Sequence, residues 1–157
     1  MKPQFSLRRF EPDDLNEVVD INEKCLPENY SHVFFMGLYE SFPETFVVAE
    51  AEKKLIGYIM CRIESSFSGL SLRPFSIMKK GHVISIAVLP EYRQKGVGTA
   101  LLERALQAMS NHYGAKSCYL EVRISNTSAI NLYKKSGFEI ERTIKEYYSD
   151  GEPAHIM

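Results

Sequence analysis

The sequence has little cysteine and no pattern that would organise it around disulfides or a metal. Its three cysteines, Cys25, Cys61 and Cys118, are far apart and odd in number. The sequence contains neither a Cys-x-x-Cys pair nor a cysteine–histidine spacing typical of a zinc site. We therefore expect reduced thiols, no bound metal and a cytoplasmic protein, because disulfides are rare in that compartment.

An excess of charge of one sign and a long apolar run are also absent. With 19 basic and 20 acidic residues, the net charge of −1 disfavours a general nucleic-acid or membrane-surface binder. No apolar stretch approaches the roughly 18–20 residues that span a bilayer. The opening MKPQFSLRRFEPDDL is too charged for a signal peptide. Repeats, low-complexity tracts and linkers are missing too, so we expect one domain over residues 1–157 with one core.

Apolar periodicity predicts a domain of the α/β (α+β) class. Charged and glycine-rich turns separate segments of alternating and of helical pattern. Residues 65–80 are expected to form a long irregular loop with apolar side chains. Strands are expected at residues 5–9, 45–51, 55–64, 82–89, 117–123 and 138–144, followed by a last hairpin. Helices are expected from residue 12 to about 24, at 32–40 after a Ser31 cap, from RQKGVG to near Gly114, and between a cap at Asn126 or Ser128 and Gly137.

The segment RQKGVG, residues 93–98, lies between an apolar strand and an amphipathic helix. The start of a helix has unpaired N–H groups and partial positive charge, and glycine lets a ligand approach the backbone. Both features suit phosphate. The segment does not match GxxxxGK[ST], and the third glycine of a dinucleotide fingerprint is replaced by Leu101. By themselves the residues leave a plain turn and a phosphate site as alternatives.

Two longer segments carry a family resemblance that covers nearly the whole chain. IAVLPEYRQKGVGTALLERAL, followed by LEVRISNTSAINLYKKSGFE, resembles the GNAT superfamily of N-acetyltransferases. CLPENY, GHVISIAV and YYSDGEPA resemble the archaeal Ard-type, ribosome-associated N-terminal acetyltransferases in particular. The resemblance implies the GNAT fold, with a central, mixed, mostly antiparallel sheet, splayed between its fourth and fifth strands, and helices on both faces. The resembled enzymes continue briefly past the position of Met157.

The resemblance also implies a cosubstrate, acetyl-coenzyme A. Its pyrophosphate would be wrapped by backbone amides of residues 93–99, and its pantetheine arm would lie in the splayed gap and contact Asn126. Implied cofactor-binding residues are Ile86, Ala87, Val88, Arg93, Gln94, Lys95, Gly96, Val97, Gly98, Thr99, Asn126 and Tyr133.

Acetyl transfer to an amine needs a base, donors for the oxyanion and a proton for the thiolate. Glu121 is the first candidate base, because the alternation of side chains along a strand places it on the face opposite to that of Leu120 and Val122. The alternative for Glu121 is a surface glutamate on a strand. His82 is the second candidate base, and its alternative is a structural histidine. The resemblance implies that Tyr133 donates the proton to the thiolate. The alternative role for Tyr133 is packing in the core. The resemblance also implies that the backbone N–H of Val88 donates a hydrogen bond to the oxyanion. Which base dominates stays open.

The resembled enzymes clasp a peptide N-terminus between a loop and the last hairpin. By position, Pro27, Glu28 and Tyr30 would line one side, and Tyr147 and Tyr148 the other. We therefore predict a protein N-terminal (N-alpha) acetyltransferase working by direct attack in a ternary complex. Alternatives are an acetyltransferase for lysine side chains or small amines, and a non-catalytic acyl-coenzyme A binding subunit.

The expected partners are protein or nascent-chain N-termini, with no direct nucleic-acid or membrane contact. The sequence does not decide the preferred first residue, a contact with the ribosome or an auxiliary subunit, or a homodimer.

Overall fold

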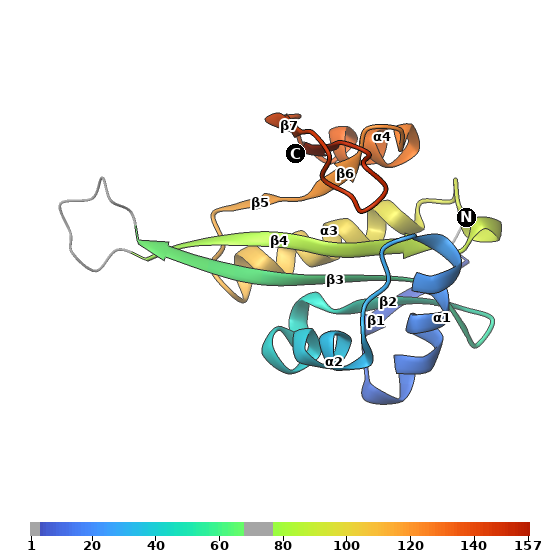
Figure 1. Cartoon of the computed structure of the whole chain (residues 1–157). Coiled ribbons are helices and arrows are strands. Elements are labelled where there is room, and N and C mark those ends of the chain that lie inside the picture. Colours follow the sequence, from blue (N-terminus) through green and yellow to red (C-terminus); the bar gives the residue numbers. More distant parts are fainter. Residues whose placement is uncertain (1–3, 68–76) are drawn as a thin grey trace.

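The computed structural model describes residues 4–67 and 77–157. Its helices are α1 (Leu15–Cys25), α2 (His32–Ser41), α3 (Val97–Asn111) and α4 (Thr127–Lys135), with short 3-10 turns at Pro12–Asp14, Pro43–Thr45 and Pro90–Tyr92. Its strands are β1 (Ser6–Arg9), β2 (Val47–Ala51), β3 (Lys54–Phe67), β4 (Ile77–Val88), β5 (Ser117–Tyr119), β6 (Glu121–Arg123), β7 (Arg142–Ile144) and β8 (Ala154–Ile156). Figure 1 shows these elements around the long β3–β4 pair.

The strands form two sheets. The larger has the order β1-β2-β3-β4-β5, in which every neighbouring pair is antiparallel except β4 and β5, which are parallel. The smaller has the order β6-β8-β7 and is antiparallel. The predicted α+β class with a mixed, mostly antiparallel sheet is therefore confirmed.

The chain leaves the larger sheet at Leu120. β5 pairs with β4 only over three positions, the last of which joins His82 and Tyr119. Leu120 then exchanges two backbone hydrogen bonds of 2.9 Å with Met157, and Glu121 begins the smaller sheet. The single strand expected at residues 117–123 is therefore wrong, because these bonds move the chain from one sheet to the other. The expected splay beside the fourth strand is confirmed.

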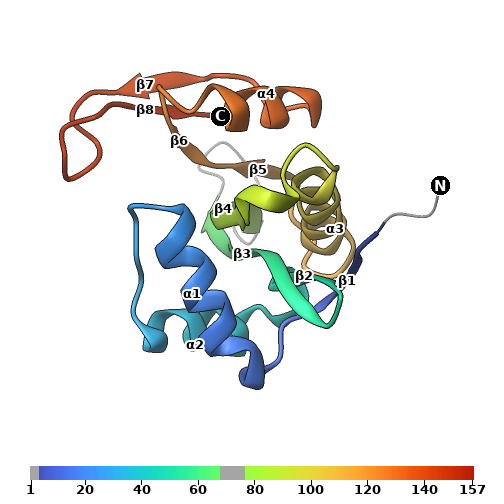
Figure 2. The same cartoon turned by 90° about the vertical axis from the view of Figure 1, so that its right-hand side faces the viewer.

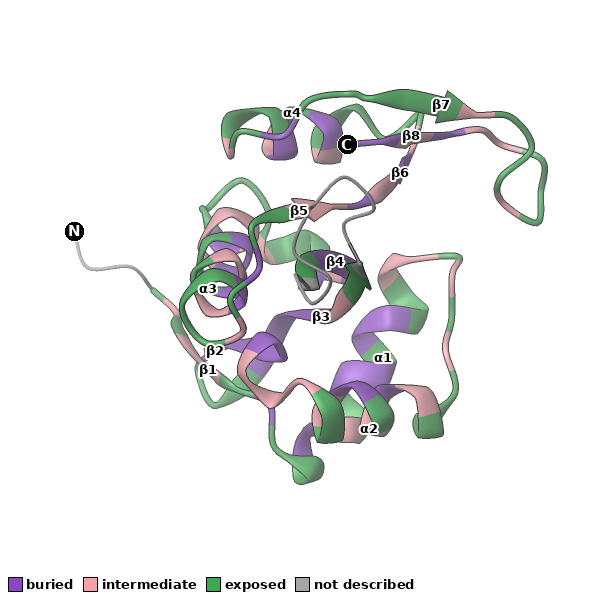
Figure 3. Ribbon diagram, turned by 90° about the vertical axis from the view of Figure 1, so that its left-hand side faces the viewer, coloured by how far each residue is buried: buried purple, intermediate pink, exposed green. Residues whose placement is uncertain are grey.

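Helices cover both faces of the larger sheet, as expected. Ile59 and Cys61 of β3 belong to a buried cluster with residues of α3 and α4. Tyr58 and Met60 point the opposite way, into a cluster with residues of α1 and α2. Figure 2 shows α1 and α2 on one side of β3 and β4 and α3 on the other, and the buried residues are coloured in Figure 3. This is the period-two alternation of a strand buried on both faces.

Several expected element boundaries are wrong. Residues 65–67 and 77–80 were expected in an irregular loop, but they extend β3 and β4, with Ser65 opposite Lys79. Residues 65, 66 and 78–80 of these arms are exposed, so no buried face leaves an apolar period in the sequence. Residues 68–76 of that loop lie outside the described residues. The strand expected at 138–144 is only Arg142–Ile144, because the Phe138 N–H still bonds to the end of α4.

The expected helix ends are largely confirmed. Ser31 caps α2 by accepting from the Phe34 N–H at 3.1 Å. Of the two alternatives for α4, the cap is Asn126, whose side-chain oxygen accepts from the Ala129 N–H. Within residues 4–67 and 77–157, none of the helices combines the length and the apolar character needed to cross a bilayer.

Candidate active site

Beyond His82, backbone groups on one edge of β4 point away from β3. The Leu89 N–H donates to the Ile56 carbonyl of the β3 side at 2.8 Å. Because bonded and unbonded positions alternate along an antiparallel pair, Ala87 also bonds to β3. The N–H and C=O groups of Ile86 and Val88 therefore point away from β3, into the opening that β5 leaves.

Contacts from outside the sheet agree with this direction. The Val88 carbonyl accepts from Arg93 Nε at 2.8 Å and lies 3.6 Å from Cys25 Sγ. The Ile84 carbonyl accepts from the Tyr30 hydroxyl at 3.4 Å. The end of α1 and the loop after it therefore border the same opening.

The start of α3 follows directly along the chain. Gly96 is the N-cap residue with φ 84°, a left-handed conformation that favours glycine. The first helical bond inside the described helix runs from the Ala100 N–H to the Gly96 carbonyl, so the N–H groups of residues 97–99 have no helical acceptor. At Gly98, a Cβ atom would come within 3.3 Å of the Leu132 side chain, so glycine permits close packing of α3 on α4.

Positive side chains gather beside this helix start. Lys95 Nζ lies 5.5 Å from the centre of the Tyr92 ring, and Lys54 Nζ lies 5.7 Å from the same centre. Arg93 and Gln94, the latter with φ 62°, complete the segment. The structure therefore brings together the predicted residues 93–99 and adds Lys54, which sequence reasoning missed because it comes from the distant β2–β3 turn.

The two candidate bases are in direct contact. His82 Nε2 lies 2.7 Å from Glu121 Oε2. His82 is only 6% exposed, and its ring stacks on Tyr119 with 4.1 Å between centres. The contact forms because His82 and Tyr119 are the last paired residues before the sheet opens. The structure thus places an imidazole–carboxylate pair at the closed end of the opening.

A second acidic residue at this position, Glu64, was missed by the sequence analysis. Its carboxylate accepts from the Tyr119 hydroxyl at 2.6 Å and from Arg62 Nε at 2.9 Å, and it lies 2.9 Å from His82 Nδ1. Burial raises the pKa of Glu64, but these three contacts outweigh it and leave the pKa below its ordinary value. The signal in the sequence is the pair Arg62-x-Glu64, two charges on one face at the end of an apolar strand.

Tyr133 lies in the core between α4 and the sheet. Its ring packs against Phe138 with 6.0 Å between centres. Burial raises the pKa of Tyr133, which keeps the phenol protonated. Core packing and a proton-donating hydroxyl are therefore compatible here.

Arg123 joins the two expected sides of the acceptor site. It donates to Glu28 from Nε at 3.0 Å, and its Nη1 binds Asp150 at 2.8 Å and Glu152 at 3.0 Å. Its guanidinium carbon lies 4.1 Å from the centre of the Tyr148 ring. The loop before α2 and the β7–β8 hairpin are therefore in contact through Arg123. Sequence reasoning missed Arg123, because its partners are far away along the chain.

The remaining expected acceptor residues border the same region. Burial, then the charge of Glu28 and further contributions from Tyr147 and Glu121, raise the pKa of Tyr30. Burial, then the charge of Glu121, raises the pKa of Tyr147. The charge of Glu121 therefore contributes to the raised pKa of both tyrosines. Pro27 is exposed in the same loop, next to Glu28.

A buried asparagine anchors this loop. Asn22 Nδ2 donates to the Glu28 carbonyl and to the Tyr58 hydroxyl, both at 3.0 Å. The Tyr58 hydroxyl in turn lies 2.7 Å from Ser85 Oγ. Because a carbonyl only accepts, the contact with Glu28 fixes the orientation of the amide. Asn22 therefore ties the loop that carries Glu28 to the sheet.

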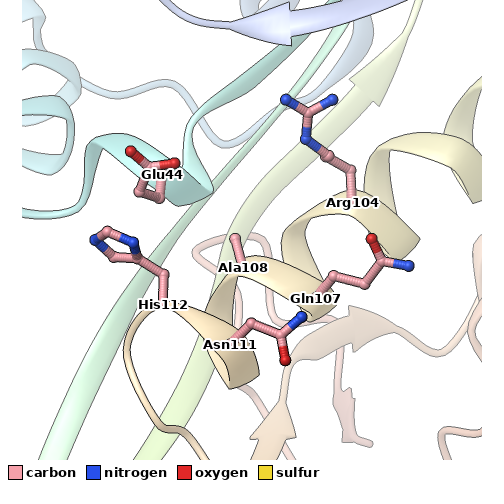
Figure 4. Close-up of a pocket in the computed structure, with 6 residues that line it drawn as sticks. All are labelled: Glu44, Arg104, Gln107, Ala108, Asn111 and His112. Carbon is pink, nitrogen blue, oxygen red and sulfur yellow. The ribbon is translucent and has the colours of Figure 1, made fainter.

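A hollow on another surface contains none of these residues. Figure 4 shows it between the Pro43–Thr45 turn and the C-terminal half of α3, lined by Glu44, Arg104, Gln107, Ala108, Asn111 and His112. It lies at the end of α3 away from Gly96. Its residues thus serve as controls for the candidate site.

An opened strand edge that leads to a positively charged helix start suits a long, thin ligand with a diphosphate at one end. A histidine–glutamate pair at the inner end of that edge suits proton transfer beside the other end of the ligand. Together these features define the class of coenzyme A-dependent acyltransferases.

Comparison with known proteins identifies the family. Residues 15–138 match the model of the acetyltransferase (GNAT) family. The chain therefore belongs to this family, and the predicted resemblance and fold are confirmed.

Relatives of known type align with almost the whole chain. An N-alpha-acetyltransferase of Sulfurisphaera tokodaii is 46% identical over 154 residues, covering 98% of this chain and 92% of that protein. The crystal structure of Ard1 from Thermoplasma volcanium is 30% identical, with a TM-score of 0.80, and covers 98% of this chain and 95% of that one. Chaetomium thermophilum Naa20 in complex with a bisubstrate analogue is 34% identical, with a TM-score of 0.82, and covers 97% of this chain and 84% of that one.

Asn22→Ala tests the loop anchor. Loss of the amide leaves the Glu28 carbonyl without its donor, at a cost of about 1–3 kcal/mol. We expect a several-fold higher KM for the acceptor amine and an unchanged Kd for acetyl-coenzyme A, measured by initial rates and calorimetry. The control is Asn111→Ala in the hollow of Figure 4, which should change neither value. An Asn22→Ala variant that is less stable but keeps its acceptor KM would contradict the anchoring role.

Proposed function

We propose that the protein is an acetyl-coenzyme A-dependent N-alpha-acetyltransferase. It transfers the acetyl group to the α-amino group of protein N-termini by direct attack in a ternary complex. The observation that carries this proposal is the 46% identity to an N-alpha-acetyltransferase over 98% of the chain. The contact of His82 with Glu121 at the closed end of the opening supports it.

Acetyl-coenzyme A is proposed to lie along β4 and end at α3. The pyrophosphate takes the free N–H groups of residues 97–99, with Arg93, Gln94 and Lys95 as further donors. The pantetheine arm pairs with the backbone of Ile86 and Val88, passing Ala87. Asn126 contacts this arm through its amide nitrogen, because its oxygen already caps α4. Because the backbone groups of Ile86 and Val88 point away from β3, the arm can pair with them without rearrangement of the sheet.

The chemical step follows from the groups around the opening. The N-terminal ammonium releases one proton to the His82–Glu121 pair, and the neutral amine attacks the thioester carbonyl. The N–H of Val88 faces the oxygen that becomes negative. As the new C–N bond forms, the C–S bond breaks and the thiolate takes a proton from Tyr133. The second proton that leaves the nitrogen restores the Tyr133 hydroxyl, so the products are the amide and the free thiol. A peptide amine has a pKa of about 7.7–8.0, against about 10.4 for lysine, so a modest base suffices.

The acceptor is proposed to bind between the two sides that Arg123 joins. Pro27, Glu28 and Tyr30 form one side, and Tyr147 and Tyr148 the other. Relatives that align with almost the whole chain are N-alpha-acetyltransferases. The substrate class is therefore protein N-termini, and the proposal includes neither nucleic acid nor a membrane.

Residues 1–157 are proposed to form one GNAT domain that acts in the cytoplasm. The cysteines Cys25, Cys61 and Cys118 are free thiols in the structure, which suits a reducing compartment. The proposed chemistry does not require a ribosome, an auxiliary subunit or a second copy of the chain.

A peptide library with varied first residues tests the function. We expect mass spectrometry to detect one added acetyl group on the α-amine after incubation with acetyl-coenzyme A. The control substrates are peptides with a blocked N-terminus and a free lysine side chain, and polyamines. Activity confined to these would favour the alternative acceptors, and coenzyme A binding without any turnover would favour a non-catalytic subunit.

Gly96→Glu tests the placement of the pyrophosphate. A carboxylate at this helix start repels the diphosphate, and the variant loses at least one charge-assisted bond of about 1.5–3 kcal/mol. We therefore expect the KM for acetyl-coenzyme A to rise roughly tenfold or more, measured by initial rates.

The control for this variant is Gly114→Glu. Gly114 is also exposed and left-handed, with φ 75° against 84° for Gly96, and neither has a neighbour within 4 Å of its Cβ position. The two variants thus carry the same charge and the same strain at opposite ends of α3. Equal KM values for acetyl-coenzyme A in both would contradict the placement.

A further inference from the structure

Both ring nitrogens of His82 face carboxylates. Nε2 lies 2.7 Å from Glu121, and Nδ1 lies 2.9 Å from Glu64. An ionised carboxylate only accepts hydrogen bonds. Glu64 has two further donors, the Tyr119 hydroxyl and Arg62 Nε, and these favour its ionised form.

These contacts decide where a neutral imidazole carries its one proton. With Glu64 ionised, the hydrogen bond at 2.9 Å requires the proton on Nδ1. The 2.7 Å contact between Nε2 and Glu121 Oε2 is a hydrogen bond only while a second proton lies in it, and Nε2 has a lone pair once that proton has left. A proton that arrives from the substrate enters this Nε2–Oε2 contact, and the imidazolium that forms lies between two carboxylates.

We propose that Glu64 is a positioning residue for acetyl transfer, which holds His82 with its proton on Nδ1 and so keeps Nε2 free to share the substrate's proton with Glu121. This inference rests on the proposed function. In each cycle the ammonium loses one proton and the His82–Glu121 pair gains one. The pair returns that proton to solvent before the next cycle.

The neighbours of Glu64 and His82 make this arrangement rigid. The Tyr119 ring stacks on the imidazole, while its hydroxyl donates to Glu64 at 2.6 Å. Lys80 Nζ lies 5.4 Å from the centre of the same ring. The charged and titratable groups around the imidazole are therefore Glu64 and Arg62 of β3, Lys80 of β4, Tyr119 of β5 and Glu121 of β6, with Tyr147 beyond Glu121.

Glu64→Gln tests the proposal by kinetics. The variant keeps the size of the side chain but removes the negative charge that favours the imidazolium. We expect kcat to fall by about tenfold to a hundredfold, part of the roughly 10²–10⁴-fold that acid–base catalysis supplies. The rising limb of the kcat–pH profile should move to lower pH, because the imidazolium then faces one carboxylate instead of two. The KM for acetyl-coenzyme A should not change.

The chain offers a closely matched control in Glu50→Gln. Glu50 accepts from Arg8 Nε at 2.9 Å, as Glu64 does from Arg62 Nε, and their side chains are 32% and 36% exposed. Glu50 lies on β2 and contacts no histidine. We expect Glu50→Gln to keep the wild-type kcat and pH profile. A Glu64→Gln variant with an unshifted profile would overturn the proposal, even if its kcat fell.

A second measurement does not depend on turnover. In protein with ¹⁵N-labelled histidine, the nitrogen shifts report the tautomer of each of the four histidines, and a His82→Gln variant assigns the signal. We expect the neutral form of His82 to carry its proton on Nδ1 in the wild type. In Glu64→Ala the proton should move to Nε2, where Glu121 accepts it. The same tautomer in both proteins would overturn the proposal.

The two measurements separate this inference from the proposed function. A wild-type protein that acetylates no α-amine contradicts the proposed function, whereas the tautomer still tests whether Glu64 holds His82. If Glu64→Ala does not fold, Glu64→Leu, which also cannot accept a hydrogen bond from Nδ1, provides the nitrogen shifts. In that variant an unchanged chemical shift at both ring nitrogens would again contradict the proposal.

Discussion

Two hydrogen bonds between the backbones of Leu120 and Met157 determine where the larger sheet opens. They hold the chain away from β4 one residue after the His82–Tyr119 pair and start the smaller sheet at Glu121. Backbone groups need hydrogen-bond partners, so β4 beyond His82 has an edge that either water or a ligand must satisfy. A parallel β5 that continued along β4 would fill this edge and leave no place for an extended cosubstrate.

The same break positions the chemistry. Glu121 is the first residue of the smaller sheet, and His82 belongs to the last pair of the larger one, so their contact of 2.7 Å spans the point of divergence. Arg123, two residues further along β6, binds the loop before α2 and the β7–β8 hairpin. One short strand therefore carries both the carboxylate of the proposed base and the arginine that joins the two sides of the acceptor site.

Local patterns made much of this predictable. The helix start at RQKGVG, the cap at Ser31 and the candidates His82 and Glu121 each leave a signal within a few residues of sequence. The contacts of His82 with Glu64 and of Arg123 with Glu28 leave none, because the partners are 18 and 95 residues apart. The break at Leu120 is hidden for the same reason, since alternation continues through residues 117–123 while the pairing partner changes. Long-range hydrogen bonds, rather than local preference, decide these features.

Amide hydrogen exchange along β4 tests the central claim most directly, because it measures the opened edge residue by residue. The N–H of Ala87 already bonds to β3, whereas those of Ile86 and Val88 face the opening. With saturating acetyl-coenzyme A, exchange at Ile86 and Val88 should slow markedly, while exchange at Ala87 should change little. Unaltered exchange at Ile86 and Val88 in the saturated protein would contradict this account of the site.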